Sequence, residues 1–285
     1  VNGYSALMTP FTWMFIPTQE LLRKFIINNF SISSLVQVEY SAFEEATVPI
    51  CTFSLQNSNN VTVGEYVNLS KFKGSKNQPI KLNEAVKNPK VEFRFSTNSS
   101  DFKNIIGTPI AYWFSDAKKN VFYNSKILSK YGNTCKGIGT GDNNKFLRFW
   151  FEIDNRKFNF SSTNKHEDTK WVAYNKGGNY RKWYGNNEYV INWKNNGQEI
   201  KNHPKSYVRN QKYFYKPGLT WTKVTSSKFS IRKFGEGFLF DDGGCCFFTD
   251  RKELYNYFLA LLNSKIFYLL GDINPTLNYQ PGDIG

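Results

Sequence analysis

Short strand-like runs separated by frequent turn residues constrain the fold of this chain more than any other feature. From about Phe93 onward, glycine, asparagine and proline interrupt the apolar runs every few residues. This spacing is typical of an irregular β-rich domain. One hairpin is expected there, with residues 237–240 and 245–248 as strands and residues 241–244 as the turn.

One clear helical pattern follows at residues 251–266. Apolar residues recur along it at a spacing of three or four, so one face of the helix should be buried. The residues expected on that face are Leu254, Tyr257, Phe258, Leu261 and Leu262.

The first 60 residues have a different pattern. Apolar residues 5–16 are followed by an expected helix from Gln19 to about Asn28. In this helix Arg23 and Lys24 should face outward. The residues expected on its buried face are Leu21, Leu22, Phe25 and Ile26.

Two strand-like runs complete this N-terminal part. They cover residues 34–39 and 47–55, and a further short helix is expected at residues 80–86. A strand, a helix and a hairpin in this order are the components of an α/β sheet edge.

The charge is distributed unevenly. The chain has 285 residues, 40% of them hydrophobic, which is enough for a large core, and its formal net charge is +14. Residues 1–60 carry a net charge of −2, so residues 61–285 carry +16. A basic balance of this size indicates a polyanionic partner. No run is long enough to span a membrane and no signal peptide is present, so a cytoplasmic protein is expected.

The cysteines do not predict a metal site. Cys51, Cys135, Cys245 and Cys246 lack the paired spacing of zinc ligands, and His166 and His203 are the only histidines. Adjacent Cys245 and Cys246 should point to opposite faces of a strand. We therefore expect four reduced thiols, as in a cytoplasmic protein.

A glycine-rich segment joined to a basic aromatic strand is the most informative motif. Residues 137–141 are Gly-Ile-Gly-Thr-Gly, and Phe146, Arg148 and Trp150 alternate after them as in a strand. A nucleotide-binding glycine turn would follow a buried strand and open a helix, and neither condition is met. The segment therefore favours an exposed contact loop for nucleic acid.

Two further segments combine cations with planar side chains. Residues 170–184 include a Gly-Gly turn that lets the main chain approach a phosphate, and residues 207–230 include hydroxyls beside lysine. Lysine at strand edges also prevents aggregation, and aromatic residues also fit strands, so each segment has a structural alternative. The residues expected at a nucleic-acid contact are Thr140, Asn143, Asn144, Lys145, Arg148, Lys176, Gly177, Gly178, Arg181, Lys182, Trp183 and Lys228.

Enzyme signatures are missing. Neither histidine lies in a serine or cysteine motif, and there is no Gly-x-Ser-x-Gly elbow or phosphate-binding loop. The adjacent carboxylates at 44–45 and 241–242 are expected in surface loops, because adjacent acids rarely form an acid/base pair. No catalytic residue is predicted.

Several strings in order resemble adenine-specific DNA methyltransferases of the PglX type, found in BREX phage-defence systems, and related fused restriction-modification enzymes. The N-terminal strings resemble the end of the catalytic domain in that family. The later strings resemble its target-recognition region. The matching segments are residues 5–24, 43–48, 102–113, 139–150, 176–185 and 274–284.

The resemblance implies transfer of a methyl group from S-adenosylmethionine to the exocyclic amine of a flipped-out adenine in the parent enzyme. The Asn-Pro-Pro-Tyr motif that holds this adenine in the family, and the glycine motif that holds the cofactor, do not occur here. Both are expected upstream of Val1. This chain alone is therefore expected to be inactive and to hold no cofactor.

The fold expected from the resemblance is α/β. Residues 1–60 would form the C-terminal edge of a Rossmann-like methyltransferase sheet, residues 61–92 a connector, and residues 93–285 a mixed α/β, β-rich target-recognition domain, with the boundary between 57 and 95. The expected function is sequence-specific recognition of duplex DNA. The alternative is a protein-interaction module that binds other subunits of a defence complex.

Within the DNA hypothesis the expected contacts have two roles. Lys145, Arg148, Lys176, Arg181 and Lys182 would hold the DNA backbone. Asn143, Asn144 and Trp183 would lie nearest the base edges or a distorted part of the duplex.

Overall fold

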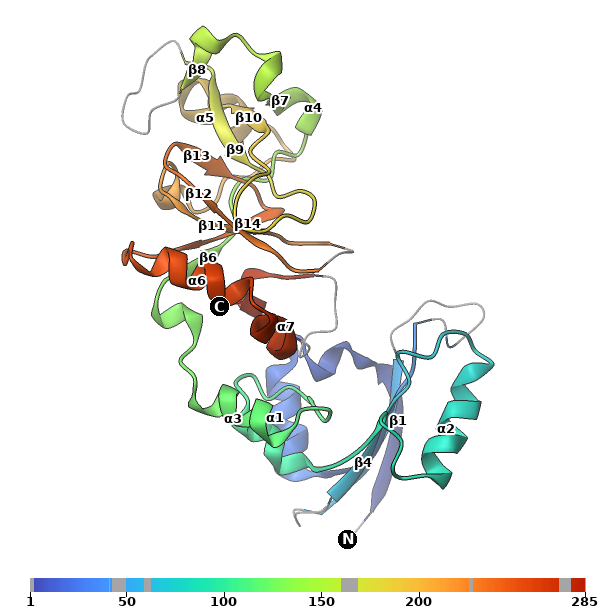
Figure 1. Cartoon of the computed structure of the whole chain (residues 1–285). Helices are drawn as coiled ribbons and strands as arrows, with labels where there is room; N and C mark the ends of the chain where they lie inside the picture. The colour runs from blue at the N-terminus through green and yellow to red at the C-terminus, as the bar shows by residue number, and fades with distance from the viewer. Residues whose placement is uncertain are drawn as a thin grey trace. The chain divides into compact units, whose positions relative to one another are not determined.

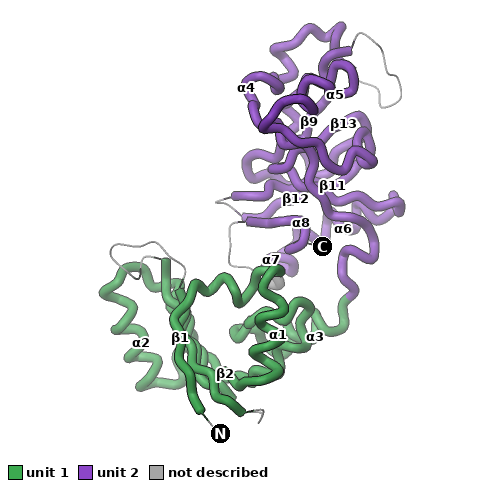
Figure 2. Tube along the Cα trace, turned by 180° about the vertical axis from the view of Figure 1, so that it is seen from behind, with its two compact units in different colours: residues 1–125 green, residues 126–285 purple. Residues whose placement is uncertain are grey.

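The computed structural model describes residues 3–40, 42, 50–58, 63–159, 169–225, 228–271 and 278–284. It divides into two compact units, Val1–Ser125 and Lys126–Gly285, called unit 1 and unit 2 (Figure 2). The expected carboxylate pair at 44–45, His166, the start of the expected strand at 47–55 and residues 274–277 of the C-terminal string lie outside the described residues.

Unit 1 contains one mixed five-stranded sheet in the order β1–β3–β2–β4–β5. Strands β2 and β4 are parallel, and the other neighbours are antiparallel. The strands are β1 (Tyr4–Pro10), β2 (Ser31–Gln37), β3 (Ile50–Gln56), β4 (Val63–Asn68) and β5 (Arg94–Asn98). The helices are α1 (Glu20–Asn29), α2 (Asn77–Lys87) and α3 (Asp116–Asn124), with 3₁₀ turns η1 (Phe11–Met14), η2 (Pro17–Gln19) and η3 (Ser99–Asn104).

The two faces of this sheet bury different residues, because side chains alternate along a strand. Leu35 of β2 packs with Ile26 and Ile27 of α1, whereas its neighbour Val36 packs with Ala85 of α2. Helices α1 and α2 therefore cover opposite faces (Figure 1). The two expected N-terminal helices are confirmed in position, and the mixed α/β class is confirmed as well.

Of the four residues predicted on the buried face of α1, Ile26 is buried as expected and the other three are exposed. Arg23 is almost completely buried, while Leu21 and Phe25 are exposed. The Arg23 guanidinium donates to four carbonyls, which satisfies a charge that burial alone would penalise. Burial still lowers the pKa of Arg23. The accepting carbonyls belong to Trp13, Ile16, Gly107 and Thr108, at 2.6 to 3.1 Å.

The segment expected to be a connector, residues 61–92, contributes β4 and α2 to the sheet unit. Strand β5 also pairs with β4 in this sheet. The compact units therefore divide at residue 125, not near residue 60 or 92. The functional boundaries predicted from the resemblance remain predictions.

Unit 2 contains two sheets. In the first, the order is β13–β9–β10–β7, and β8 also pairs with β9; in the second, the order is β12–β11–β14–β6. The strands are β6 (Asn133–Cys135), β7 (Leu147–Phe149), β8 (Phe158–Asn159), β9 (Trp171–Asn175), β10 (Tyr189–Asn192), β11 (Gly218–Thr222), β12 (Ile231–Phe234), β13 (Phe238–Phe240) and β14 (Gly244–Phe248). The helices are α4 (Asn143–Phe146), α5 (Lys194–Lys201), α6 (Leu254–Leu262), α7 (Lys265–Gly271) and α8 (Pro281–Ile284), with 3₁₀ turns η4 (Leu128–Lys130), η5 (Trp150–Glu152), η6 (Asn155–Lys157) and η7 (Gln211–Tyr213).

The predicted hairpin at residues 237–248 is wrong. Strand β13 pairs in parallel with β9, while β14 pairs with β11 and β6 in the other sheet. The chain crosses between the sheets at Asp241 and Asp242. Asp241 accepts a hydrogen bond from the Tyr174 hydroxyl at 2.7 Å, and Asp242 forms an ion pair with Lys223. These carboxylates hold the crossing and do not lie in a free surface loop.

Strand β14 is covered on both faces. Cys246 belongs to the core between the sheets, whereas its neighbour Cys245 belongs to the core beneath α6. The expected opposite orientation is confirmed. Burial raises the pKa of Cys245 to about 12. Within the described residues, no group of three His, Cys, Asp or Glu side chains is arranged to hold a metal ion.

The expected C-terminal helix is shorter than predicted. Helix α6 ends at Leu262, and its buried residues include Tyr255 and Phe258, whereas Tyr257 is exposed. Asn263 follows the helix and uses its side-chain amide to bind the backbone of Ile231 in β12, with both bonds near 3 Å. The end of α6 is thus fixed to an edge strand.

Candidate nucleic-acid interface

The glycine-rich segment 137–141 is packed inside unit 2. The Ile138 amide donates to the Phe240 carbonyl at 2.8 Å, and Gly139 exchanges two backbone hydrogen bonds of 2.9 Å with Tyr207. A Cβ atom at Gly137 would collide with the Phe240 carbonyl, and one at Gly139 with the Tyr207 ring. The expected exposed contact loop is therefore wrong for this segment. Its glycines permit close packing of the chain.

The next five predicted residues lie just before α4, in α4 and in β7. Thr140 is buried and donates to the side chain of Asn143, so both help to fix the start of α4. Asn144 accepts a hydrogen bond from Arg148 through its carbonyl. Lys145 lies 3.1 Å from Glu199, and this hydrogen bond lowers the pKa of the Glu199 carboxyl. Most of these groups already have partners inside the protein.

The loop between β9 and β10, residues 176–188, has several positive φ values. Gly177 packs against the backbone of Gly243, and Gly178 packs against the side chain of Asn186. Trp183 has a φ of 74°, in the left-handed region that non-glycine residues rarely adopt. Its backbone is fixed to β12 by hydrogen bonds of 3.1 Å to Ile231 and 2.8 Å from Lys233. The indole is 51% exposed, so the fixed backbone displays this ring at the surface.

The cations of this loop differ in their partners. Lys182 donates to the carbonyl of Asn263 at 2.6 Å and lies over the Tyr268 ring, so it holds the end of α6. Arg181 is 3.9 Å from Glu188 and its side chain is 55% exposed. Lys176 lies 4.7 Å from the ring centre of Tyr189. Arg181 and Lys176 are thus better placed for a ligand than Lys182.

A row of stacked rings, which the sequence did not predict, lies beside these cations. Phe149 stacks on Tyr189 at 4.9 Å, and Phe151 stacks on Phe149 at 5.3 Å with an interplanar angle of 3°. We call these three residues the ring ladder. Trp150 contacts Phe151 edge to face. Phe149, Trp150 and Phe151 are 37%, 55% and 65% exposed.

The local backbone explains how the ring ladder forms. Strand β7 ends at Phe149, and the 3₁₀ turn η5 then brings Phe151 to the same side as Phe149. The Phe149 amide donates to the Glu152 carboxylate at 2.7 Å, and the Trp150 amide donates to the Glu188 carbonyl at 2.9 Å. The period-two alternation predicted from the sequence grouped Trp150 with Arg148 and gave no role to Phe149 and Phe151. The sequence did contain one signal for the ladder, the run of three aromatic residues at 149–151.

Contacts within unit 2 bring two of the predicted cations to the ring ladder. Lys176 contacts the ring ladder at Tyr189. Arg181 lies 3.9 Å from the carboxylate of Glu188, whose carbonyl accepts from the amide of Trp150 beside the ladder. Arg148 is in register with Val190, so its side chain points to the face of the sheet opposite Phe149 and Tyr189. Lys228 is exposed, and no contact connects it to this cluster within the described residues. We call Lys176 and Arg181 the cation cluster.

A buried arginine lies behind Arg181. Arg232 is fully buried, and Nη1 reaches the Arg181 carbonyl at 3.5 Å. Its Nε and Nη2 atoms have no hydrogen-bond partner within the part of the chain that the structure describes. Burial lowers the pKa of Arg232 to about 10, so the side chain is still cationic at neutral pH. This charge adds to the positive potential under the loop.

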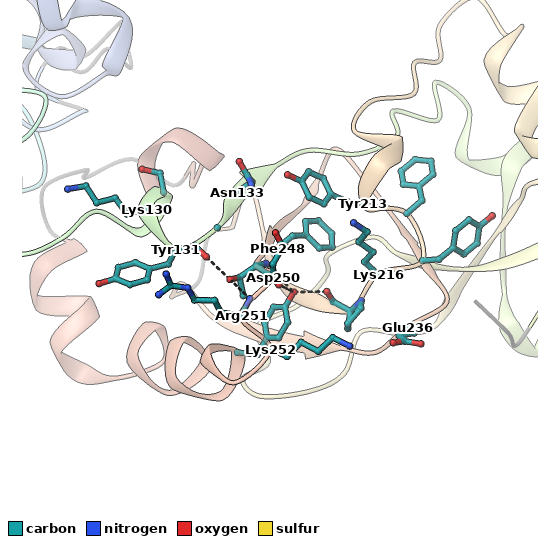
Figure 3. A pocket seen from close by; sticks show the side chains of 17 residues that line it. Lys130, Tyr131, Asn133, Tyr213, Lys216, Glu236, Phe248, Asp250, Arg251 and Lys252 are labelled. Atoms are coloured by element: carbon teal, nitrogen blue, oxygen red, sulfur yellow. Dashed lines mark hydrogen bonds between the residues drawn. The ribbon is translucent and has the colours of Figure 1, made fainter. Parts of the chain in front are cut away.

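Unit 2 also contains a cavity of about 790 Å³, shown in Figure 3. Tyr213 in its wall stacks on Phe248 at 4.6 Å, and Lys216 lies over the Tyr213 ring. The Tyr255 hydroxyl donates to the Pro217 carbonyl at 2.9 Å. The charged residues in the lining are Lys130, Lys216, Glu236, Asp250, Arg251 and Lys252. Part of the third predicted segment, residues 207–230, thus forms a cavity wall.

The fold is similar to that of parts of two solved restriction-modification enzymes. The type IIL restriction-modification enzyme MmeI, solved in complex with DNA, superimposes with a TM-score of 0.51 over 90% of this chain and 34% of MmeI, at 10% identity. A nuclease-deletion mutant of the type ISP enzyme LlaGI, in complex with a DNA substrate mimic, gives 0.50 over 98% of this chain and 28% of LlaGI, also at 10% identity. No protein-family model matches the chain.

Similarity in sequence identifies a narrower group of proteins than similarity in fold. The chain is 33% identical over 99% of its length to the adenine-specific methyltransferase PglX of Lacticaseibacillus casei (strain Zhang) and to the adenine-specific methyltransferase BrxX of Escherichia coli O9:H4 (strain HS). It spans about a quarter of the length of these relatives, 25% and 23%. The resemblance to adenine-specific methyltransferases of the PglX type is therefore confirmed. Within the described residues, no helix has the length and apolar character to span a membrane.

Proposed function

We propose that this chain is the part of a PglX-type adenine-specific DNA methyltransferase that recognises duplex DNA. Unit 1 would be the edge of the Rossmann-like catalytic sheet, and unit 2 would contain the target-recognition domain. Methyl transfer from S-adenosylmethionine, in a restriction-modification or phage-defence system, would be the activity of the whole enzyme. The relatives named as adenine-specific methyltransferases support this proposal.

The observation that carries the proposal is the cation cluster beside exposed rings. Residues 126–285 contain 25 Lys and Arg against 14 Asp and Glu, a net charge of +11. Lys176 and Arg181 lie beside the exposed rings of this basic unit. Cations hold phosphates, and nearby planar or amide side chains contact bases.

The cofactor would be bound elsewhere in the whole enzyme. The glycine-rich segment 137–141 is filled by Phe240 and Tyr207, so it offers no space for S-adenosylmethionine. The glycine-rich segment therefore does not fit the cofactor.

The test is binding of the purified chain to a library of duplex DNA at several salt concentrations, with sequencing of the bound fraction. We expect an enriched motif and a steep loss of affinity with salt. Arg148→Ala and Arg181→Ala should each weaken binding and lower the log-log salt slope by about 0.9, because each removes one phosphate contact. Unchanged binding in both variants would refute the assignment of these arginines.

A matched control uses Lys130→Ala, which removes a lysine from the cavity wall and should leave the salt slope unchanged. Salt-dependent binding without an enriched motif would mean that specificity requires the rest of the enzyme. No binding of the wild-type chain to any duplex would refute DNA recognition and favour the protein-interaction alternative.

A further inference from the structure

We propose that the open end of the ring ladder, Phe151 with Trp150 at its side, is a binding site for an unpaired nucleobase in the DNA duplex. This inference rests on the proposed function and adds a ligand to it. A base released from its pair, or exposed at a distorted step, would continue the stack that Tyr189, Phe149 and Phe151 begin.

The last ring of the ladder, Phe151, is stacked on one neighbour and is largely exposed to solvent. Phe151 lies almost parallel to Phe149, at an interplanar angle of 3°, yet it is 65% exposed. Trp150 contacts Phe151 at 85°, so it meets the ring edge to face instead of stacking on it. A planar ligand of the size of a base can therefore stack on the exposed part of Phe151.

The backbone holds these rings before any ligand arrives. The Phe149 and Trp150 amides are bound by the Glu152 carboxylate and the Glu188 carbonyl, at 2.7 and 2.9 Å. Binding a planar group then orders few additional bonds, which reduces the entropic cost of association. Exposed aromatic rings in a fixed arrangement contribute little to folding and are typical of binding surfaces.

The charges beside the ladder favour a nucleotide over an apolar protein segment. Lys176 covers the Tyr189 end of the ladder, and Arg181 lies near Glu188 at its side. Glu152 and Glu188 are the neighbouring acids; Glu152 is hydrogen-bonded to the backbone, and Glu188 faces Arg181. Rings that stack on bases while cations hold the adjacent phosphates are the usual arrangement for unpaired nucleotides.

In the interior of a regular duplex both faces of every base are covered by neighbouring bases, so there the ladder can stack only on a base that is released from its pair or exposed at a distorted step. This gives the proposal a direct probe. A duplex with a single bulged 2-aminopurine should bind more tightly than the same duplex fully paired. The fluorescence of the bulged base should fall on binding, because stacking on an aromatic ring quenches it.

Phe151→Ala should reduce affinity for the bulged duplex about 5- to 150-fold, the range for loss of one base-aromatic stack, and should abolish the quenching. Phe151→Trp should keep both, whereas Phe151→Leu should lose both, because leucine is apolar but cannot stack. The salt slope should be the same in Phe151→Ala as in the wild type, since no phosphate contact is lost. Tyr257→Ala removes an exposed ring on α6 and is the control expected to show no change.

The outcomes separate this inference from the proposed function. If the wild-type chain binds the paired and bulged duplexes equally, or if Phe151→Ala and Phe151→Leu retain affinity and quenching while Arg181→Ala weakens binding, the base site is refuted and DNA recognition stands. If the wild-type chain binds neither duplex, the proposed function is refuted. Thermal unfolding of each variant shows whether it is folded.

Discussion

Two ring stacks in unit 2 have nearly the same composition and different surroundings. In the ring ladder, Phe151 lies on Phe149 at 5.3 Å and 3°, and in the cavity wall, Tyr213 lies on Phe248 at 4.6 Å and 4°. A lysine lies over a tyrosine in both places. Yet Phe248 is 3% exposed and Phe151 is 65% exposed.

The difference shows that aromatic residues beside lysine do not by themselves identify a binding surface. The cavity-wall stack is closed, because Phe248 is also in contact with the rings of Phe234 and Phe240 in the core between the sheets. The ladder ends in solvent. One arrangement therefore stabilises the fold, and the other is available to a ligand.

The largest expected effect is on the stability of the closed stack. Phe248→Ala should lower the free energy of unfolding by about 3 to 5 kcal/mol, because it leaves a cavity where three rings meet. Phe151→Ala should change it by no more than about 0.5 kcal/mol, as expected for an exposed side chain. Urea unfolding of both variants measures the two values. Equal losses would show that the ladder is part of the core and would remove the distinction.

The glycines provide a second comparison between closed and open surfaces. Gly139→Ala should lower the free energy of unfolding by about 1 to 3 kcal/mol, since its Cβ would be forced against the Tyr207 ring. Gly235→Ala is the matched control, because nothing lies within 4 Å of its Cβ position. The midpoints of urea unfolding test this pair. If Gly139→Ala is as stable as the wild type, the close packing of residues 137–141 is refuted and the prediction of an exposed contact loop is restored.

The sequence predicted the positions of local elements better than their surroundings. Helix α1 was expected at Gln19 to about Asn28 and is found at Glu20–Asn29, because apolar residues at helical spacing predict a helix. The burial of Arg23 was not predicted, since the carbonyl of Gly107 that accepts from it lies 84 residues away. Long-range partners of this kind leave no trace in local periodicity.

The same limit explains the failures in unit 2. The hairpin at residues 237–248 was predicted from two adjacent apolar runs, but the partners of these strands are β9 for one and β11 and β6 for the other. Within the candidate site, the sequence selected Lys176 and Arg181, which lie around the ladder, together with Thr140 and Lys182, which have partners inside the fold. Residue type predicted the chemistry, and only the fold showed which groups remain exposed.

The smallest expected effect concerns two lysines that both lie over tyrosine rings, Lys182 over Tyr268 and Lys176 over Tyr189. Lys182→Ala should lower the free energy of unfolding by about 1 kcal/mol, because it removes the hydrogen bond to the Asn263 carbonyl that fixes the end of α6. It should not change the salt slope of DNA binding.

Lys176→Ala should have the opposite effects. Its free energy of unfolding should stay within about 0.5 kcal/mol of the wild type. Its log-log salt slope for DNA binding should be lower by about 0.9. Each lysine is thus the control for the other, measured by urea unfolding and by DNA binding at several salt concentrations. If Lys182→Ala lowers the slope and Lys176→Ala does not, the DNA-contacting surface lies over α6 and α7 and not beside the ring ladder. Because both residues are lysines that lie over a tyrosine ring, a difference between them must come from their surroundings.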